Sequence, residues 1–332
     1  MKVVVLDGFT LNPGDLSWGQ LEKLGELTVY ERTPKDKIIE RAQGARVLMT
    51  NKTSLNAEAL NQLPDLKYIG VLATGYDVVD TISAAQKGII VTNIPTYGTN
   101  SVAQFTIALM MELCHRIGHH EQSVRQGDWS RSKDWSYWNN PLIELAGKTF
   151  GVVGAGRIGL QAAHIASALG MNIVALSRLG NSRHKTNIPN LKWVEMDELL
   201  QCSDVISLHC PLTANNEGFI NKDTLSTMKR TAFLINTARG KLVNEEHLAY
   251  ALNHDWIAGA ALDVLSSEPP SEDNPLFKAK HCMITPHMAW ATKEARGRLM
   301  DTAVYNLVQF MEGKPINVVC ARYSLGDKPL VF

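Results

Sequence analysis

The 332-residue chain has no excess of either charge, since 33 Lys and Arg residues balance 33 Asp and Glu residues. Nucleic-acid-binding proteins usually show a basic excess, so this balance argues against that class. No segment reaches the roughly 18 uninterrupted apolar residues of a membrane span. The first residues also lack the small-residue cleavage site of a signal peptide. We therefore expect neither a nucleic-acid partner nor a membrane association.

Cysteine is also scarce. The cysteines are odd in number, widely spaced and without a C-x-x-C pair, at Cys114, Cys202, Cys210, Cys282 and Cys320. This pattern is typical of reduced thiols in a cytoplasmic protein. His115 and His119 have the i, i+4 spacing of metal ligands on a helix, but no third ligand accompanies them in the sequence, so we expect no metal site.

The sequence contains a regular alternation of short apolar runs with amphipathic stretches, which predicts βαβ units and a parallel sheet. In the first series, strands are expected at 3–6, 27–30, 46–50, 68–72 and 89–92, with helices at 16–24, 35–43, 55–63 and 78–87. In the second, strands are expected at 149–153, 172–177, 205–208, 232–236, 257–263 and 281–284, with helices at 158–169, 196–201, 222–227, 245–253 and 292–312. The two series predict two α/β halves of different size.

A segment between the two series breaks this rhythm. Apolar positions at helical spacing predict one long helix over 101–117, with Thr99 or Asn100 as its N-cap. The stretch 126–141 follows and holds three tryptophans, Trp129, Trp135 and Trp138. Large aromatic side chains are rarely left in water, so we expect this stretch to pack on a partner domain or subunit.

A glycine-rich turn begins the second series. The sequence from Gly154 through Gly156 to Gly159 is a G-x-G-x-x-G, with the strand TFGVV before it and a helical run after it. In that context, Gly154 allows the tight turn, Gly156 lets the backbone approach a pyrophosphate, and Gly159 lets helix and strand pack closely. The helix N-terminus supplies N–H groups and a partial positive charge, so we predict a dinucleotide site.

The second strand of this half indicates which dinucleotide binds. An NAD site expects an acidic residue roughly 20 residues after the glycines, yet residues 155–194 contain no acidic residue. Ser177 and Arg178 stand at the expected position. A hydroxyl with a guanidinium suits a 2′-phosphate, so we predict NADP(H) over NAD(H). The alternative is that Arg178 is a solvated surface residue and that the protein takes NAD(H).

Three polar residues of different chemistry follow strands of the second series. They are Arg239 in N-T-A-R-G, Glu268 in S-S-E-P-P and His287 in T-P-H. The carboxyl ends of parallel strands form the ligand-binding edge of an open α/β sheet. An arginine that holds a carboxylate, a histidine that moves a proton and a glutamate that fixes the imidazole and favours its protonated form together fit a keto-acid reduction.

With these motifs in view, the chain resembles the D-isomer-specific 2-hydroxyacid dehydrogenase family over essentially its whole length. The motifs that carry the resemblance are L-A-T-G-Y-D at 72–77, G-A-G-R-I-G at 154–159, H-C-P-L-T at 209–213, N-T-A-R-G at 236–240, A-L-D-V with E-P-P, and T-P-H at 285–287. The tracts 50–53 and 284–296 resemble most the glycerate dehydrogenase/hydroxypyruvate reductase branch. The resemblance implies reduction of a small 2-keto acid, hydroxypyruvate or glyoxylate, with NADP(H) or NAD(H).

The resemblance also implies the architecture. We expect two Rossmann-like doubly wound parallel-sheet domains, of which the smaller is discontinuous. Residues 1–98 with 288–332 would form the substrate domain, and residues 99–287 the dinucleotide-binding domain. Relatives are typically homodimers, which suits the tryptophan-rich stretch, and Trp138 is a candidate to reach the neighbouring subunit's site.

Site residues follow from the same resemblance. The catalytic residues would be Arg239, Glu268 and His287. The backbone of Ala73, Thr74 and Gly75 would bind the substrate carboxylate. The cofactor-binding residues would be Gly154, Gly156, Arg157, Ile158, Gly159, Ser177, Arg178, Cys210, Pro211, Thr237, Ala238 and Asp263, with Asp263 holding the nicotinamide carboxamide.

Two positions and two other functions stay open at this point. Many relatives carry a Gly and a Ser where this chain has Ala289 and Trp290, so Trp290 either narrows the substrate pocket or packs at the domain hinge. Lys52 either pairs with a substrate carboxylate or hydroxyl or is a surface lysine. The other functions are a phosphoglycerate dehydrogenase-like enzyme and a dinucleotide-sensing corepressor on the same fold.

Overall fold

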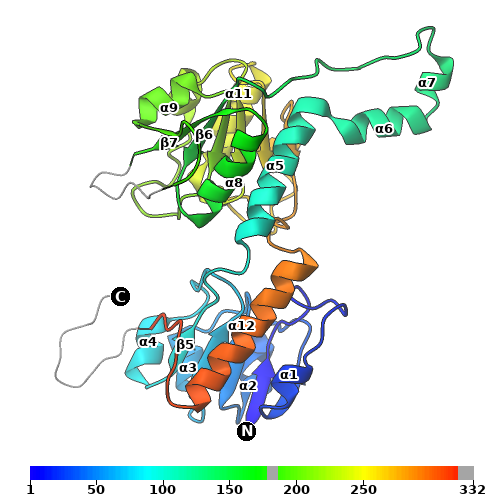
Figure 1. The fold of residues 1–332 in the computed structure, drawn as a ribbon. Coiled ribbons are helices and arrows are strands. Elements are labelled where there is room, and N and C mark those ends of the chain that lie inside the picture. The colour runs from blue at the N-terminus through cyan, green and yellow to red at the C-terminus, as the bar shows by residue number, and fades with distance from the viewer. Residues whose placement is uncertain (178–185, 321–332) are drawn as a thin grey trace. The chain divides into compact units, whose positions relative to one another are not determined.

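The computed structural model describes residues 1–177 and 186–320. The chain divides into two compact units (Figure 1). Unit 1 comprises Met1–Gly98 together with the C-terminal segment that begins at Ala291, and unit 2 comprises Thr99–Trp290. The chain leaves unit 1 after residue 98 and returns to it at residue 291. The sequence analysis placed this return at residue 288.

Unit 1 is built on a five-stranded sheet in which every neighbouring pair is parallel. Its strands lie in the order β2-β1-β3-β4-β5. Their bounds are Lys2–Val5 (β1), Glu26–Val29 (β2), Val47–Thr50 (β3), Tyr68–Val71 (β4) and Ile90–Thr92 (β5). The order reverses between β1 and β3, so the carboxyl ends of these two strands form the topological switch point of unit 1.

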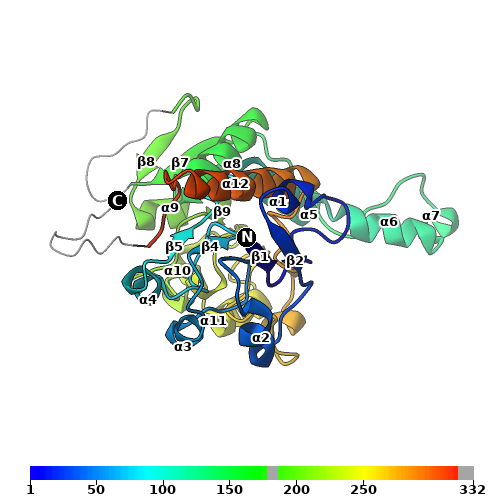
Figure 2. The same ribbon diagram turned by 90° about the horizontal axis from the view of Figure 1, so that it is seen from below.

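Helices cover both faces of this sheet, as Figure 2 shows from below. One face carries α2 (Ile38–Ala42), α3 (Ala57–Asn61) and α4 (Thr81–Gln86), and the other carries α1 (Gly19–Glu22) and α12 (Lys293–Met311). The ring of Phe310 on α12 contacts that of Tyr68 on β4, with ring centroids 4.8 Å apart. A short 3₁₀ turn at Lys35–Lys37 precedes α2, so the helix expected over 35–43 is divided.

Unit 2 is built on a seven-stranded sheet, again parallel throughout, in the order β12-β11-β10-β9-β6-β7-β8. The strands are Thr149–Val153 (β6), Asn172–Leu176 (β7), Lys192–Val194 (β8), Val205–Leu208 (β9), Phe233–Asn236 (β10), Gly259–Leu262 (β11) and Cys282–Ile284 (β12). The order reverses between β6 and β9, which is the doubly wound arrangement. Both sheets confirm the predicted fold class.

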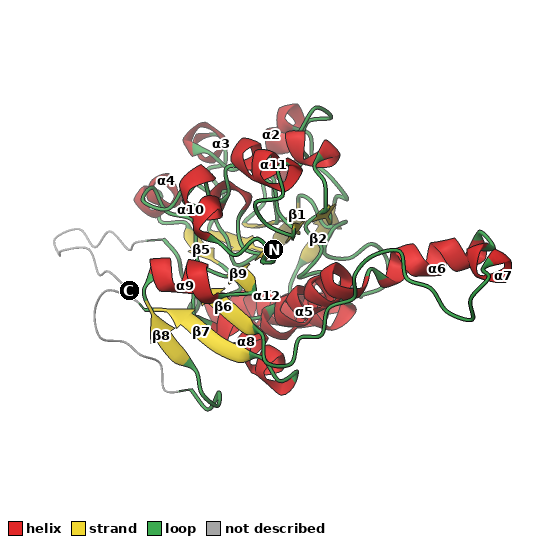
Figure 3. Cartoon of the chain, turned by 90° about the horizontal axis from the view of Figure 1, so that it is seen from above, coloured by secondary structure: helices red, strands yellow, loops and turns green. Residues whose placement is uncertain are grey.

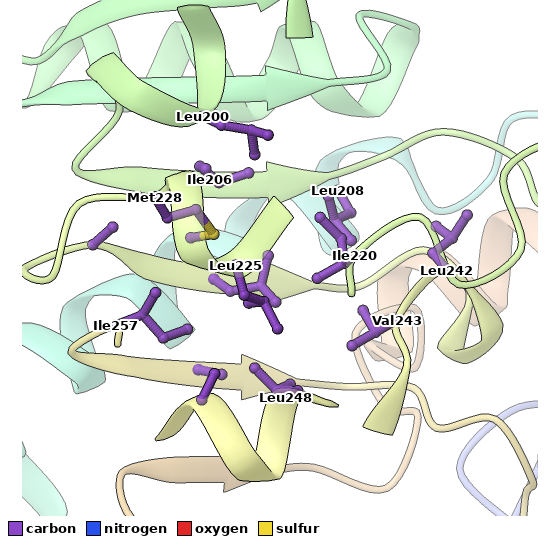
Figure 4. Close-up of a cluster of buried hydrophobic side chains, with 14 of the residues drawn as sticks. Leu200, Ile206, Leu208, Ile220, Leu225, Met228, Leu242, Val243, Leu248 and Ile257 are labelled. Carbon is purple, nitrogen blue, oxygen red and sulfur yellow. The ribbon is translucent and has the colours of Figure 1, made fainter. Parts of the chain in front are cut away.

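The helices of unit 2 enclose a hydrophobic core on each face of this sheet. On one face lie α5 (Thr99–His115) and α8 (Arg157–Ala168), with side chains such as Met110, Phe150 and Ala162 fully buried. On the other lie α9 (Met196–Cys202), α10 (Lys222–Thr227) and α11 (Glu245–Asn253). Figure 4 shows the core beneath these three helices, which includes Leu200, Ile206, Leu225 and Leu248.

Several elements differ from the sequence-based prediction. The helix predicted over 101–117 spans Thr99–His115 instead, so Thr99 and Asn100 lie in its first turn rather than at its N-cap. It ends there because Arg116 adopts a left-handed backbone with φ 45°. The sequence analysis also missed β8 and the 3₁₀ helices Gly240–Leu242 and Pro275–Lys278. β8 is a three-residue edge strand whose extended form comes from pairing with β7, which a local pattern does not reveal.

The tryptophan-rich stretch follows one helix and contains a second, and the sequence analysis predicted neither. These are α6 (Ile117–Arg125) and α7 (Asp128–Arg131), and Figures 1 and 3 show both extending away from the sheet of unit 2. We call residues 117–142 the arm. Its tryptophans are exposed, with 53% of Trp129, 88% of Trp135 and 65% of Trp138 accessible. Within a single chain this part of the arm therefore leaves its aromatic surface uncovered.

No helix in the ranges 1–177 and 186–320 is long and apolar enough to span a membrane.

Candidate active site

The glycine loop lies at the topological switch point of unit 2, directly after β6 and before α8. Gly154 has a positive φ of 103°, a backbone conformation that only glycine adopts without strain. A Cβ built on Gly154 would lie 2.4 Å from the backbone nitrogen of Cys210, and one on Gly159 would lie 2.3 Å from the carbonyl oxygen of Gly154. The loop is therefore packed against the end of β9, and neither glycine admits a side chain.

Gly156 differs from these two glycines in facing open space. A Cβ there would meet nothing within 4 Å of the described residues, and Gly156 is the N-cap of α8. Having no side chain, it leaves the first N–H groups of α8, beginning at Arg157 and Ile158, without a side-chain cap. A helix N-terminus of this kind binds phosphate through N–H groups and the helix dipole. The loop fits a dinucleotide pyrophosphate.

The structure describes Ser177, one of the two residues expected to bind the ribose of the dinucleotide. Ser177 follows β7, is half-buried, and donates its backbone N–H to the carbonyl oxygen of Val194 at 2.8 Å. Arg178, the predicted partner of a 2′-phosphate, lies outside the described residues. The hydroxyl of Ser177 therefore stands at the end of the second strand of the dinucleotide fold, where the choice between NAD and NADP is made.

Cys210 and Pro211 follow β9 on the other side of the switch point. The Asn216 amide secures their loop, since its Nδ2 donates to the Pro211 carbonyl at 2.9 Å and its Oδ1 accepts from the N–H of Thr213 at 2.7 Å. Burial raises the pKa of the Cys210 thiol, which keeps it protonated and unreactive. Next to it, burial lowers the pKa of His209 to about 4, so its ring is neutral at pH 7.

Arg239 lies in a tight turn after β10 that a buried asparagine holds. Asn236 Oδ1 accepts the N–H of Ala238 at 3.0 Å, and Asn236 Nδ2 donates to the carbonyl of Arg239 at 2.9 Å. Thr237 is fixed by a hydroxyl contact of 3.1 Å with Thr106 on α5. The Arg239 side chain is exposed, and its guanidinium donates to the Ala238 carbonyl at 2.8 Å. The structural role of Asn236 was not predicted, although its position in the N-T-A-R-G motif marks it.

Glu268 and His287 form a direct pair. Glu268 Oε2 and His287 Nδ1 are 2.6 Å apart, and about a third of each side chain is exposed. The second carboxylate oxygen, Oε1, accepts the N–H of Leu265 at 3.1 Å, which fixes the carboxylate relative to its own loop. Glu245 supports this loop by accepting the N–H of Ser266 at 2.6 Å. The pair is therefore held in place from the glutamate side.

The backbone on the histidine side is strained and is held by Asp263. His287 has a positive φ of 51°, and its N–H donates to the carbonyl of Thr285 at 2.9 Å. Asp263 is 1% exposed and accepts three hydrogen bonds: from the Thr285 hydroxyl at 2.6 Å, from the N–H of Met288 at 2.9 Å and from the N–H of Ala289 at 2.8 Å. This network fixes both sides of His287, a role for Asp263 that the sequence analysis did not foresee.

The three residues Arg239, Glu268 and His287 follow the neighbouring strands β10, β11 and β12, so they share one edge of the unit 2 sheet. The Arg239 turn and the Glu268 loop touch closely, because a Cβ built on Gly240 would lie 1.9 Å from the carbonyl carbon of Leu265. A positive group, a carboxylate–imidazole pair and a dinucleotide-type helix N-terminus thus share the carboxyl edge of a single sheet.

Trp290 and Trp138 are the two tryptophans that the sequence analysis connected with the substrate site. Trp290 is half-buried and lies three residues after His287, and the neighbouring Ala289 carbonyl accepts the Ser101 hydroxyl at 2.7 Å. Trp138 is exposed on the arm. Among residues 1–177 and 186–320, no group of three or more His, Cys, Asp or Glu side chains is arranged to hold a metal ion.

The predicted substrate residues of unit 1 lie at the carboxyl edge of its sheet. Ala73–Gly75 follows β4 and is secured by Thr74, whose hydroxyl donates to the Ile94 carbonyl at 2.8 Å, and by Asn93 Nδ2, which donates to the Thr74 carbonyl at 2.7 Å. Lys52 follows the neighbouring strand β3 and is exposed. Its turn is held by Asp7, which the sequence analysis did not single out.

Taken together, the fold and this set of residues define a nicotinamide-dependent dehydrogenase. The comparisons with known proteins lead to the family. Residues 107–289 match the model of the D-isomer specific 2-hydroxyacid dehydrogenase NAD binding domain. The chain therefore belongs to the D-isomer specific 2-hydroxyacid dehydrogenase family, and the family assignment made from the motifs is confirmed.

Individual relatives match over nearly the full chain. A hydroxypyruvate reductase of Blautia hydrogenotrophica is 51% identical, with 96% of this chain and 99% of that protein covered. A glycerate dehydrogenase of Methylorubrum extorquens is 42% identical, covering 96% of this chain and 98% of that one. The solved structure of an acyclic imino acid reductase in complex with NADPH and D-Arg matches with a TM-score of 0.82 and 31% identity, covering 96% of this chain and all of that one.

Proposed function

We propose that this protein reduces hydroxypyruvate to D-glycerate, and glyoxylate to glycolate as a second reaction, with NADPH as the preferred reductant. The observation that carries the proposal is the 2.6 Å pairing of Glu268 with His287 on the sheet edge that also bears Arg239 and the glycine loop. The relatives named hydroxypyruvate reductase and glycerate dehydrogenase support the choice of substrate.

His287 is the proton donor in this proposal. Because Glu268 binds Nδ1, Nε2 is the ring nitrogen that gives the proton to the keto oxygen as it becomes a hydroxyl. The hydrogen bond between the carboxylate and Nδ1 also holds the ring at a fixed distance from Glu268. A nicotinamide cofactor held at the glycine loop would supply the hydride for C2 of the substrate. The loop contacts of Asp263 hold the imidazole in one orientation for this step.

Arg239 binds the carboxylate and the keto oxygen and stabilises the negative charge that develops on that oxygen. The backbone N–H groups of Ala73, Thr74 and Gly75 contribute further donors for the carboxylate. Trp290, three residues from the proton donor, favours a small substrate over long-chain 2-keto acids. Replacing Arg239 with Ala should chiefly raise KM for the keto acid, whereas an unchanged KM would assign carboxylate binding to other residues.

The preference for NADPH rests on the chemistry of the second strand end. The hydroxyl of Ser177, the guanidinium of Arg178 and the lack of any acidic residue in 155–194 favour a 2′-phosphate over a free 2′-hydroxyl. Thr237, Ala238, Cys210 and Pro211 complete the proposed dinucleotide contacts. The related imino acid reductase, whose structure contains NADPH, supports the choice.

The experiment that tests the proposal is a panel of initial rates. Hydroxypyruvate, glyoxylate and pyruvate are each reduced with NADPH and with NADH, and we expect hydroxypyruvate with NADPH to give the highest kcat/KM. A preference for NADH would refute the phosphate argument and leave the catalytic pair intact. Tight dinucleotide binding without turnover of any 2-keto acid would refute the enzyme and favour a dinucleotide-sensing corepressor, and selective oxidation of 3-phosphoglycerate would favour a phosphoglycerate dehydrogenase.

We also infer that the protein works as a homodimer in the cytoplasm. The arm exposes three tryptophans, a loss of apolar burial that a second copy would recover, and it would bring Trp138 to the neighbouring subunit. All five cysteines are free, in keeping with a reducing compartment. Light scattering of the wild type and of Trp135→Ser tests the dimer, because a monomeric wild type would exclude it.

A further inference from the structure

The topological switch point of unit 1 carries an unusual set of hydrogen bonds. Asp7 follows β1, and its carboxylate accepts three backbone N–H groups from the turn after β3: Asn51 at 2.7 Å, Lys52 at 2.6 Å and Thr53 at 2.7 Å. The three donors lie 44 to 46 residues away in sequence, so the contact exists only because β1 and β3 are neighbours. Asp7 thus joins the two sides of the switch point.

Further hydrogen bonds make this turn rigid. The Thr50 hydroxyl donates to the Thr53 carbonyl at 2.8 Å, which closes the turn on itself. Asn51 Nδ2 donates to the carbonyl of Leu72, the residue before the Ala73–Gly75 loop, at 3.0 Å. The turn after β3 and the loop after β4 are therefore joined into one rigid edge, and the switch-point carboxylate holds it from the β1 side.

The pattern of burial in this turn leaves one side chain outward. Asn51 is 5% exposed and Thr53 is 8% exposed, whereas Lys52 between them is exposed. Among the residues of unit 1 that the structure describes, the Lys52 ammonium forms no hydrogen bond and no ion pair. The Asp7 carboxylate accepts backbone N–H groups and not the Lys52 ammonium, so it fixes the backbone of the turn that carries Lys52.

In an open parallel sheet, ligands bind at the carboxyl ends of the strands beside the switch point. A fixed backbone beneath a cation removes part of the conformational entropy that binding an anion would otherwise cost, and the ammonium can then form a charge-assisted hydrogen bond. We propose that Asp7 is a positioning residue that fixes the 51–53 turn so that Lys52 binds the substrate carboxylate beside the backbone of Ala73–Gly75. This inference rests on the proposed reductase function.

A double-mutant cycle on the full-length enzyme tests the inference. The variants are Asp7→Asn, Lys52→Met and the double mutant, with Lys52→Arg as the conservative variant. Asn keeps one acceptor oxygen of Asp7 but places an NH₂ donor against the backbone N–H groups. Loss of a charge-assisted contact predicts that Lys52→Met raises KM for hydroxypyruvate and glyoxylate alike, by about tenfold or more, with kcat little changed.

Asp7→Asn should produce a similar rise in KM when Lys52 is present and little further rise in the Lys52→Met background. Lys52→Arg should recover most of the affinity. Asp204→Asn is the matched control. The Asp204 carboxylate also accepts a backbone N–H, from Thr149 at 2.8 Å, but Asp204 precedes β9 and so lies at the amino ends of the unit 2 strands, away from their carboxyl ends. The control should leave KM unchanged even if the protein becomes less stable.

Three results would overturn the inference while the wild type remains an active reductase. One is a normal KM in both single variants. Another is additive effects of Asp7→Asn and Lys52→Met, which would show that Asp7 does not act through Lys52. The third is a loss confined to hydroxypyruvate, which would assign Lys52 to the substrate hydroxyl. If Asp7→Asn does not fold, Asp7→Glu replaces it in the cycle. An inactive wild type would instead refute the proposed function.

Discussion

Gly240 offers a sharp test of how closely the catalytic loops of unit 2 are packed. A Cβ at this position would lie 1.9 Å from the carbonyl carbon of Leu265, 2.0 Å from its oxygen and 2.4 Å from the nitrogen of Ser266. All three are backbone atoms, so no side-chain rotation can relieve the contact. Ordinary van der Waals contact begins at 3.4 Å, so in Gly240→Ala the two segments must separate by about 1.5 Å.

That separation would move the two catalytic groups on either side of it. Gly240 follows Arg239 directly, and the Leu265 N–H is bonded to Glu268, which orients His287. A misplacement of about 1 Å can lower a rate about a hundredfold, so we expect kcat/KM of Gly240→Ala to fall by at least that factor. Overpacking of a buried site should cost about 1–3 kcal/mol and lower the Tm by roughly 2–12 °C.

The assay compares steady-state kinetics, thermal unfolding and NADPH binding in wild type and Gly240→Ala. NADPH binding should weaken less than kcat/KM falls, because Gly154–Gly159 lies at a different pair of strands and only the proposed contacts of Thr237 and Ala238 belong to the displaced turn. Gly297→Ala is the matched control, since a Cβ there meets nothing within 4 Å and the residue lies inside α12. It should be neutral or slightly stabilising. A Gly240→Ala enzyme with normal kcat/KM and Tm would refute the packing argument.

Three further outcomes are expected. His287→Ala should lower kcat by about a thousandfold while NADPH still binds, as measured by fluorescence titration, and near-normal turnover would reject His287 as the proton donor. Asp263→Ala should lower kcat more than it weakens NADPH binding, because it frees the segment that holds His287; a loss of binding alone would favour the carboxamide role predicted from the sequence. Burial disfavours the charged ring of His209 and lowers its pKa from an ordinary 6.5 to about 4. Because the unfolded chain therefore binds the proton more readily, the free energy of unfolding should decline as pH falls from 6.5 toward 4. The decline is at most about 3 kcal/mol, it should be smaller in His209→Gln, and equal pH profiles in thermal unfolding would contradict this account.

The sequence predicted those features that depend on short segments. The alternation of apolar runs placed most strands and helices, and the strand–glycine turn–helix pattern located the dinucleotide loop, because each is encoded by neighbouring residues. The positions of Arg239, Glu268 and His287 in the segments that follow three strands likewise placed them at the carboxyl edge of a parallel sheet. Elements without a local signal were missed, such as the edge strand β8 and the arm helices α6 and α7.

Tertiary structure decided how distant segments hold one another. The pairing of Glu268 with His287 spans 19 residues, Asp263 reaches Met288 and Ala289 across 25 and 26 residues, and Asp7 reaches its turn across 44 to 46. Each contact requires two strands to be neighbours in a sheet, and strand order is set by the packing of the whole unit rather than by any local pattern. The sequence thus determined which groups line the edges of the sheets, and the tertiary structure determined which carboxylate holds which loop, because a hydrogen bond forms only between groups that the folded chain brings together.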